Sequence, residues 1–276
     1  QGAPALDNFI KKLPKQFYNS GISEQNIIGT AAGLSILGFK PYIYSINSFI
    51  IYHTIEYIKI DLCSMKQPVT IVGVGSGYSY PQDGPTHHST EDIALTVPLS
   101  NLDVFNPSDS VLVSDIVNFT YKSKKPSFVR LDRQFCEKFY SKKNKISDGF
   151  RFMSKSNIQK KCVISSGFFV PKLVNLFKKQ NKKYDLIDFY RLKNFNLKNL
   201  IKSLSKYDKI ICVEEHSIKF GIGSIISEII TDNQINLKLK RLGLLEDKIF
   251  GYGSRDQLLK SNKLGDEHIL NSIKNF

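Results

Sequence analysis

Short apolar runs that alternate with segments of helical periodicity constrain the fold of this chain more than any other feature. The apolar runs are rich in β-branched and aromatic residues, which is typical of buried strands. We expect strands at residues 40–46, 68–74, 103–106, 127–131, 162–165, 185–189, 209–213 and 237–242. We expect helices at residues 24–34, 49–65, 109–119, 168–179, 197–204 and 222–230. Strands that alternate with helices predict parallel sheets covered on both faces, an α/β fold.

A polar segment divides the chain into two such α/β regions. Residues 134–160 are rich in Lys and Ser and show little periodicity, as a linker does. We therefore expect two tandem doubly wound domains with mainly parallel sheets, at residues 1–135 and 161–276. The linker is expected at residues 136–160, and no shorter internal repeat is visible.

Composition excludes several classes of protein. A chain of 276 residues with 41% hydrophobic residues can bury a large core. No apolar run reaches the roughly 18 residues of a membrane span, and no secretory leader pattern opens the sequence. The cysteines lie far apart, without metal-ligand or redox spacing, at Cys63, Cys136, Cys162 and Cys212. We expect a cytoplasmic protein with reduced thiols and no membrane partner.

The net charge of +14 raises the question of a nucleic-acid partner. Only six of the 39 basic residues are arginines, and the lysines are spread along the chain. Nucleic-acid sites usually cluster basic residues with aromatic ones, so this distribution argues against nucleic-acid binding. A positive surface would still attract anionic, phosphorylated substrates.

The stretch at residues 17–34 is a Gly-containing turn followed by an apolar helix. Ser23 is in the position of a helix cap, and Gly29 and Gly33 lie four residues apart, so a second backbone can approach that face. Glu24 carries the only charge between Lys15 and Lys40. A carboxylate there either complements the helix dipole or serves chemistry, and the stretch alone does not decide between the two.

Three further blocks contain charged residues, and two of them also contain histidine and glycine. They are Asp83-Gly84-Pro85-Thr86-His87 with Glu91-Asp92, Arg130-Leu131-Asp132-Arg133, and Glu214-Glu215-His216 with Gly221-Ile222-Gly223. The first lies beyond an expected strand, where open α/β sheets place their ligands. The glycine-rich loop at residues 73–77 lacks the lysine of a phosphate-binding P-loop and is a weak nucleotide signal.

In order and spacing, these four blocks resemble the transketolase superfamily of thiamine-diphosphate enzymes. The Gly-Ile-Ser-Glu-Gln-Asn element at residues 21–26 resembles that of the family's pyrimidine-binding domain. The Glu-Glu-His block at residues 214–216 resembles that of its C-terminal domain. The resemblance implies these two domains in tandem, together with thiamine diphosphate as the cofactor.

The resemblance also implies roles for single residues. Glu24 would hydrogen-bond the aminopyrimidine ring of the cofactor, and burial would raise the pKa of that carboxyl. Tyr52 would stack on the pyrimidine, and Phe49 would form a wall beside it. We expect His216 to serve packing, and His53 and His88 to be structural or exposed to solvent.

Substrate recognition is expected from four residues. Asp83 would bind a hydroxyl of the donor sugar, and His87 would act near the reacting carbonyl as a catalytic residue beside Glu24. Arg133, with Arg130 as a second choice, would pair with a substrate phosphate. Asp132 is an unusual neighbour for a phosphate site, and a surface salt bridge with Arg133 is the alternative.

The family's diphosphate-binding motif, Gly-Asp-Gly…Asn, does not occur in the sequence. We therefore expect a separate N-terminal diphosphate-binding transketolase subunit to hold the diphosphate and Mg²⁺, with no metal ligands on this chain and an α₂β₂ heterotetramer as the assembly. The lead-in that usually precedes the first helix of the pyrimidine-binding domain is also absent from the sequence.

The predicted function is that of the C-terminal subunit of a split transketolase in carbohydrate metabolism. It would transfer a two-carbon ketol unit from a ketose phosphate to an aldose. The alternatives are the β-subunit of a 2-oxo acid dehydrogenase, a synthase that resembles deoxyxylulose-phosphate synthase, and a non-catalytic interaction subunit. The Asp-Gly-Pro-Thr-His loop with Arg133 favours a sugar, and the presence of Glu24 argues against the non-catalytic subunit.

Overall fold

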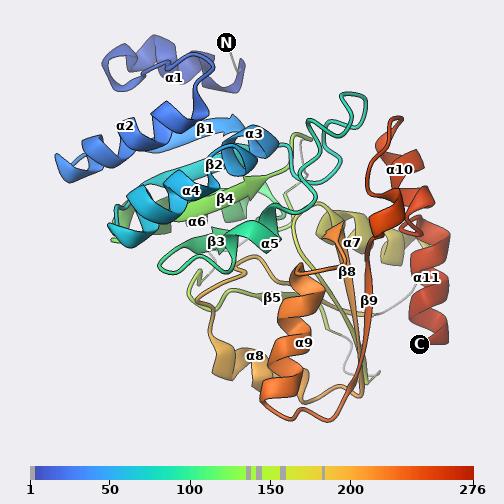
Figure 1. Ribbon diagram of the computed structural model, residues 1–276. Helices are drawn as coiled ribbons and strands as arrows, with labels where there is room; N and C mark the ends of the chain where they lie inside the picture. Colours follow the sequence, from blue (N-terminus) through green and yellow to red (C-terminus); the bar gives the residue numbers. More distant parts are fainter. Residues whose placement is uncertain (1–3, 135–137, 141–144, 156–159, 182–183) are drawn as a thin grey trace.

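The protein is described here by a computed structural model that covers residues 4–134, 138–140, 145–155, 160–181 and 184–276. Two β-sheets with surrounding helices lie one after the other along the chain (Figure 1). This is the expected α/β architecture with mainly parallel strands. Within the described part of the chain, no helix has the length and apolarity that crossing a membrane requires.

The first sheet is parallel, with strand order β1-β2-β4-β3. Its strands are β1 (Tyr42–Ile46), β2 (Thr70–Val74), β3 (Asp103–Phe105) and β4 (Ser127–Leu131). Around it lie α1 (Asp7–Lys12), α2 (Glu24–Ile36), α3 (Asn47–Tyr52), α4 (Ile55–Tyr57), the π-helix η3 (Ile58–Ser64), α5 (Asp92–Thr96) and α6 (Ser110–Lys122). Short 3₁₀ helices η1 (Pro4–Leu6) and η2 (Pro14–Gln16) flank α1.

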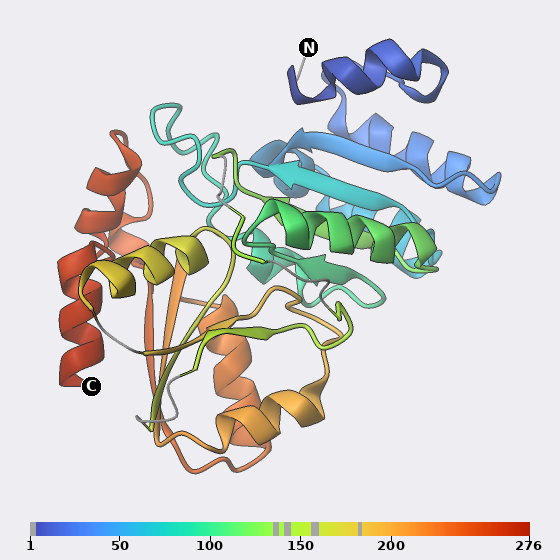
Figure 2. The ribbon, with the colours of Figure 1, turned by 180° about the vertical axis from the view of Figure 1, so that it is seen from behind.

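Strand alternation explains why this sheet is covered on both faces. Phe128 of β4 packs into a core cluster with α2 and α3, whereas its neighbour Val129 packs with Leu112 and Ile116 of α6. Successive side chains of a strand point to opposite faces, so an uninterrupted apolar strand requires helices on both sides. Figures 1 and 2 show α6 on the face opposite to α2 and α4.

The second sheet has the strand order β5-β7-β6-β8-β9, and only its edge strand β5 is antiparallel. The strands are β5 (Arg151–Ser154), β6 (Lys161–Ser165), β7 (Asp185–Asp188), β8 (Lys209–Ser217) and β9 (Lys238–Leu244). The helices are α7 (Phe169–Lys179), α8 (Leu197–Leu204), α9 (Ile222–Asp232), η4 (Glu246–Lys248), α10 (Arg255–Ser261) and α11 (Asp266–Asn275).

The two α/β regions share one hydrophobic core and a backbone connection. Buried residues of both regions belong to a single apolar cluster. The segment after β7 extends the edge of the first sheet, since Asn106 N–H donates to the Tyr190 carbonyl and Leu192 N–H to the Val104 carbonyl, each at 2.8 Å. The two regions therefore form one packed unit, and loops of the first can be held by the second.

Several elements differ from the expectations. Strand β5 lies within residues 136–160, the expected linker, and pairs with β7. The helix expected at residues 49–65 is broken into α3, α4 and η3, with Thr54 donating its hydroxyl proton to the Ile50 carbonyl at the first break. Helices α10 and α11 were not expected. Cys136 lies outside the described residues, and Cys63, Cys162 and Cys212 are buried free thiols.

Candidate active site

Glu24 is the first residue of α2, and the start of this helix lies beside the end of α3, the helix that follows β1. Its side chain is half-buried, and among the described residues it has no hydrogen-bond or ion-pair partner. Ser23 does not cap the helix, because its hydroxyl donates to the Ser20 carbonyl at 2.7 Å. The side chain of Gln25 donates to the His53 carbonyl at 3.3 Å, so the start of α2 touches the end of α3.

A row of aromatic rings runs from α3 to the Asp-Gly-Pro-Thr-His loop. We call Phe49, His53, Tyr80 and His87 the aromatic group. Phe49 stacks on His53 at 5.7 Å between ring centroids and meets the edge of His87 at 5.0 Å. His87 in turn lies 5.8 Å from the ring of Tyr80. The guanidinium carbon of Arg133 lies 4.8 Å above the Tyr80 ring, which ends the row with an exposed cation.

The loop that carries Asp83 and His87 turns at Gly84. Gly84 has a φ of +74°, a left-handed conformation that favours glycine. Its carbonyl accepts the amide protons of His87 and His88, and Thr86 bonds the Nδ1 of His87 at 3.0 Å. The Asp83 side chain is exposed. The loop thus presents an exposed carboxylate and an oriented imidazole, and Tyr80 lies between this imidazole and Arg133.

Tyr52 is held by a different set of contacts from those of the aromatic group. Its hydroxyl donates to Glu91 at 3.0 Å and accepts the amide protons of Thr90 and Glu91 at 3.2 and 3.1 Å. Burial, followed by the charges of Asp92 and Glu91, raises the pKa of this phenol well above its usual value. Tyr52 therefore anchors the segment that leads into α5, while Phe49 is the ring next to His87.

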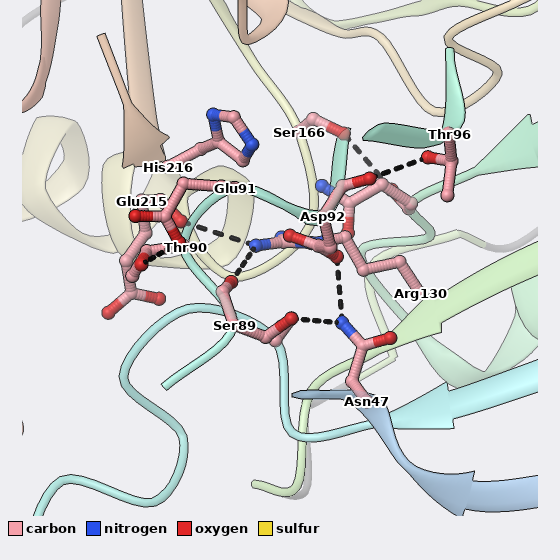
Figure 3. Close-up of polar contacts among 12 residues, drawn as sticks. Asn47, Ser89, Thr90, Glu91, Asp92, Thr96, Arg130, Ser166, Glu215 and His216 are labelled. Carbon is pink, nitrogen blue, oxygen red and sulfur yellow. Dashed lines mark hydrogen bonds and ion pairs between the residues drawn. The ribbon is translucent and has the colours of Figure 1, made fainter. Parts of the chain in front are cut away.

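Arg130 lies inside β4 and is buried, with 4% of its surface exposed. Its guanidinium pairs with Asp92 at 2.6 Å and donates to the carbonyls of Ser89 and Glu215 (Figure 3). Asn47 completes the network by donating to both Ser89 and Asp92 at 2.7 Å. These contacts occupy Arg130, and the structure brings only Arg133 of the two candidate arginines to the aromatic group.

The Glu-Glu-His block is part of the domain contact. Glu214 accepts the amide protons of Ile222 and Gly223 at the start of α9, where a side chain on Gly221 would lie 2.0 Å from its carboxylate. Burial raises the pKa of Glu214 to about 7, although these two amides oppose the shift. The glycines around Ile222 are therefore required for this carboxylate to approach the helix.

His216 links the second region to the first. Its Nδ1 contacts the Ser217 carbonyl at 2.8 Å, and its Nε2 accepts the amide proton of Ala94 in α5 at 3.4 Å. Burial lowers the pKa of this imidazole to about 4, which keeps it neutral near pH 7. His216 thus packs between the two regions and is not one of the rings of the aromatic group. His88 is also buried, with its ring edge against Tyr78 at 4.8 Å.

The sequence reasoning missed the residues of α10. Arg255, the first residue of α10, pairs with both Asp132 and Glu215, and its side chain is 6% exposed. Ser254 and Gln257 form a capping box at this helix start. The Ser-x-x-Gln pattern is visible in the sequence and would have indicated the helix, although not the long-range partners of Arg255.

Metal ligands were not expected on this chain. Across the part of the chain that the structure describes, no group of three or more His, Cys, Asp and Glu side chains is arranged to hold a metal ion. The candidate site therefore consists of one partnerless carboxylate, a row of rings, an exposed aspartate and an exposed arginine.

Comparison with known proteins agrees with the order of these elements. Residues 4–137 match the transketolase pyrimidine binding domain, and residues 159–269 match the transketolase C-terminal domain. The chain belongs to the transketolase superfamily. It is similar to one of the subunits of the apulose-4-phosphate transketolase of Actinobacillus succinogenes, with 26% identity over 95% of this chain and 85% of that protein.

Solved transketolases share the fold of this chain. A split-gene transketolase, described as an inactive β4 tetramer, superposes with a TM-score of 0.84 at 23% identity, over 99% of this chain and 88% of that one. The transketolase from Leishmania mexicana superposes with a TM-score of 0.76 at 18% identity, over 92% of this chain but only 37% of that one. This chain therefore corresponds to the pyrimidine-binding and C-terminal portion of the transketolase fold, a thiamine-dependent family.

Proposed function

We propose that this chain is the C-terminal subunit of a two-chain, thiamine-diphosphate-dependent transketolase. It transfers a two-carbon ketol unit from a ketose phosphate to an aldose. The observation that carries the proposal is the partnerless carboxylate of Glu24 at the head of α2, next to the aromatic group that ends at Arg133. A half-buried carboxylate that makes no hydrogen bond or ion pair within the chain keeps its acceptor oxygens available for a ligand.

The residues present fit the pyrimidine half of the cofactor. Glu24 offers a free acceptor for a ring nitrogen, and Phe49, half-buried on α3, offers an apolar face for a flat heterocycle. We assign Phe49 the stacking role that we expected of Tyr52, because Tyr52 is engaged with Glu91. When bound, thiamine diphosphate supplies the nucleophilic carbon that receives the two-carbon unit.

The substrate side is assigned to the loop residues and Arg133. Asp83 binds a sugar hydroxyl as an acceptor, and His87 donates or accepts a proton at a substrate oxygen, with its ring oriented by Thr86. Arg133 pairs with the substrate phosphate, since a guanidinium matches phosphate oxygens in bidentate geometry. Arg130 is not included, because Asp92 and two backbone carbonyls occupy it.

The free face of α2 supports a partner subunit. A side chain built on Gly29 or Gly33 would meet no atom of this chain within 4 Å. Leu37 is 75% exposed and Phe39 is 60% exposed just beyond the helix, although α2 carries no charge after Glu24. Exposed apolar residues beside an uncharged helix surface are typical of a contact with another chain. We assign this face to a diphosphate-binding subunit that also holds Mg²⁺, in a cytoplasmic α₂β₂ assembly.

Reconstitution tests the proposal. This chain is co-expressed with a chain that carries Gly-Asp-Gly…Asn, and the purified complex is assayed with thiamine diphosphate, Mg²⁺ and an aldose phosphate acceptor. Ketose phosphates and 2-oxo acids serve as alternative donors. Turnover of a ketose phosphate by the complex, but not by either chain alone, is the expected result. Turnover of a 2-oxo acid only, or of neither donor, would contradict the proposal.

A further inference from the structure

A segment of the C-terminal region lies beside both loops of the candidate substrate site. Residues 249–254 connect η4 to α10, and we call these residues together with Arg255, the first residue of α10, the α10 lead-in. Figures 1 and 2 both show the α10 lead-in next to the loop that follows β2. Its last residue, Arg255, contacts the loop after β4, and Tyr252 contacts the loop that carries Asp83.

Arg255 occupies both oxygens of Asp132. Its Nη1 and Nη2 lie 3.2 and 2.6 Å from the two carboxylate oxygens, in bidentate geometry. The guanidinium also pairs with Glu215 and lies over the ring of Phe168, with 3.4 Å between the guanidinium carbon and the ring centroid. Because the side chain of Asp132 is only 8% exposed, this pair is desolvated and specific. Asp132 is therefore not free to pair with its neighbour Arg133.

This arrangement decides what Arg133 can bind. An unpaired Asp132 would lie next to Arg133 along the chain and would compete with a phosphate for its guanidinium. With Asp132 neutralised by Arg255, Arg133 lies exposed over Tyr80. The loop itself is fixed to the first sheet, since the Leu131 carbonyl accepts the amide protons of Gly75 and Ser76 at 2.9 and 3.0 Å.

Tyr252 supports the second loop. A Cβ on Gly84 would lie 2.1 Å from Cε1 of Tyr252, so the phenol ring packs on the backbone of the residue after Asp83. Tyr252 is 73% exposed, so its side chain contributes little to the hydrophobic core. The start of the same loop is anchored by Tyr78, a fully buried ring whose hydroxyl donates to the Ile249 carbonyl at 2.7 Å.

We propose that Arg255 and Tyr252 are positioning residues for the substrate phosphate and sugar sites of this subunit. Arg255 keeps Arg133 available for a phosphate by pairing with Asp132, and Tyr252 holds the loop of Asp83 and His87. The C-terminal region thereby sets the affinity for a phosphorylated substrate without touching the cofactor half of the site. This inference rests on the proposed function for its substrate and on the contacts above for its geometry.

The test combines four variants of the chain in the reconstituted complex. Arg255→Gln frees Asp132, and the double variant Arg255→Gln with Asp132→Asn removes the competing charge as well. Tyr252→Ser alters an exposed side chain, so this variant should fold and can test the proposal even if Arg255→Gln does not fold. Arg191→Gln is the matched control, because Arg191 is a buried arginine that pairs across the same domain contact, with Asp103 at 2.9 Å, away from both loops.

The kinetic readout is KM and kcat for a phosphorylated and an unphosphorylated ketose donor. Arg255→Gln should raise KM for the phosphorylated donor by roughly tenfold or more while kcat changes little, because a displaced binding group weakens binding more than chemistry. The unphosphorylated donor should be unaffected. Asp132→Asn should restore most of the lost affinity. Arg191→Gln should change neither KM.

The structural readout is amide hydrogen exchange of residues 82–88 and 131–134 in the chain itself. Faster exchange of 82–88 in Tyr252→Ser and of 131–134 in Arg255→Gln, with wild-type exchange in Arg191→Gln, is the expected pattern. Unchanged exchange in both variants, or equal KM increases for both donors without rescue by Asp132→Asn, would overturn the inference. A complex that shows no turnover while these loops loosen would refute the proposed function and leave the loop positioning standing.

Discussion

The candidate site and the contact between the two regions use the same residue types in opposite ways. At the site, Glu24 has no partner among the described residues, and Asp83 and Arg133 have exposed side chains. At the domain contact, Arg130 and Asp92 are 4% and 0% exposed, and each bonds several groups. Arg130 and Arg133 are three residues apart, yet one is enclosed and the other is open.

The difference shows that the motif segments of this chain contain two kinds of polar residue. One kind is paired within the chain, as Arg130 is with Asp92, and the other, which includes Glu24, has no partner among the described residues. Enclosed charges are expected to affect stability, because a buried ion that loses its partner is left desolvated. Open charges are expected to affect binding or turnover, because water solvates them in the free chain.

The largest expected effect is on kcat, and it tests whether Glu24 is a catalytic residue or only an acidic residue at a helix start. Glu24→Gln should lower kcat of the reconstituted complex by about 10⁴-fold, or about 5 kcal/mol in barrier, because the amide cannot share a proton with the cofactor ring. Thermal unfolding of the free chain should be unchanged. Glu56→Gln, at an exposed glutamate of α4, is the matched control and should keep full activity. A Glu24→Gln complex with near wild-type kcat would place Glu24 among the structural residues.

The second effect is on stability, and it tests the buried charges of the domain contact. Arg130→Gln should lower the free energy of unfolding by about 3–5 kcal/mol, because Asp92 would remain buried without its cation. Urea unfolding followed by circular dichroism measures the loss. Arg241→Gln, at an exposed arginine of β9, should stay within about 0.5 kcal/mol of wild type. Equal stabilities for the two variants would show that the Arg130 network contributes nothing to folding.

The third effect is a pH dependence at the domain contact. The pKa of Glu214 is raised by burial from 4.5 to about 7, so the folded state binds more protons than the unfolded state between these values. Stability relative to Glu214→Gln should therefore fall by up to about 3 kcal/mol as pH rises from 4.5 to 7, and stay level above 7.

Paired urea titrations of wild type and Glu214→Gln at pH 4.5, 5.5, 6.5 and 7.5 measure this difference. Subtracting the two curves removes the opposing contribution of His216, which both proteins share. A difference that does not change with pH would mean that Glu214 titrates alike in the folded and unfolded states.

The smallest effect concerns the free face of α2. Gly33→Ala should stabilise the isolated chain by about 0.5–1 kcal/mol, because alanine favours a helix and its methyl group meets no atom of this chain. The same change should weaken association with the diphosphate-binding subunit, measured by analytical ultracentrifugation. Unaltered association would show that this face is not at the subunit contact.

Much of the fold could be predicted from the sequence because long apolar strands and helices carry periodic signals. All eight expected strands occur, with ends shifted by a few residues. Strand β5 was missed because Arg151–Ser154 is a short edge strand without an apolar run. Helices α10 and α11 are short and mostly polar, and the expected helix at residues 49–65 breaks at Thr54, where tertiary contacts override local pattern.

The site was predicted less completely because motif residues do not reveal their partners. Arg130 lies inside the expected strand 127–131 and Arg133 lies beyond its end, so position in the strand was the available signal that only Arg133 is open. The sequence assigned the stacking role to Tyr52 and the wall to Phe49, and it did not show the bond of Tyr52 to Glu91, because the two residues are 39 positions apart. Arg255 carried no motif, and its partner Asp132 is 123 positions away.

The most direct test of the proposed function is calorimetric titration of thiamine diphosphate with Mg²⁺ into this chain, into the diphosphate-binding subunit and into their complex. We expect saturable binding to the complex only, because the proposed function assigns one half of the cofactor site to Glu24 and Phe49 and the other half to the second chain. Tight binding by this chain alone, shown by size-exclusion chromatography to be free of any partner, would contradict it.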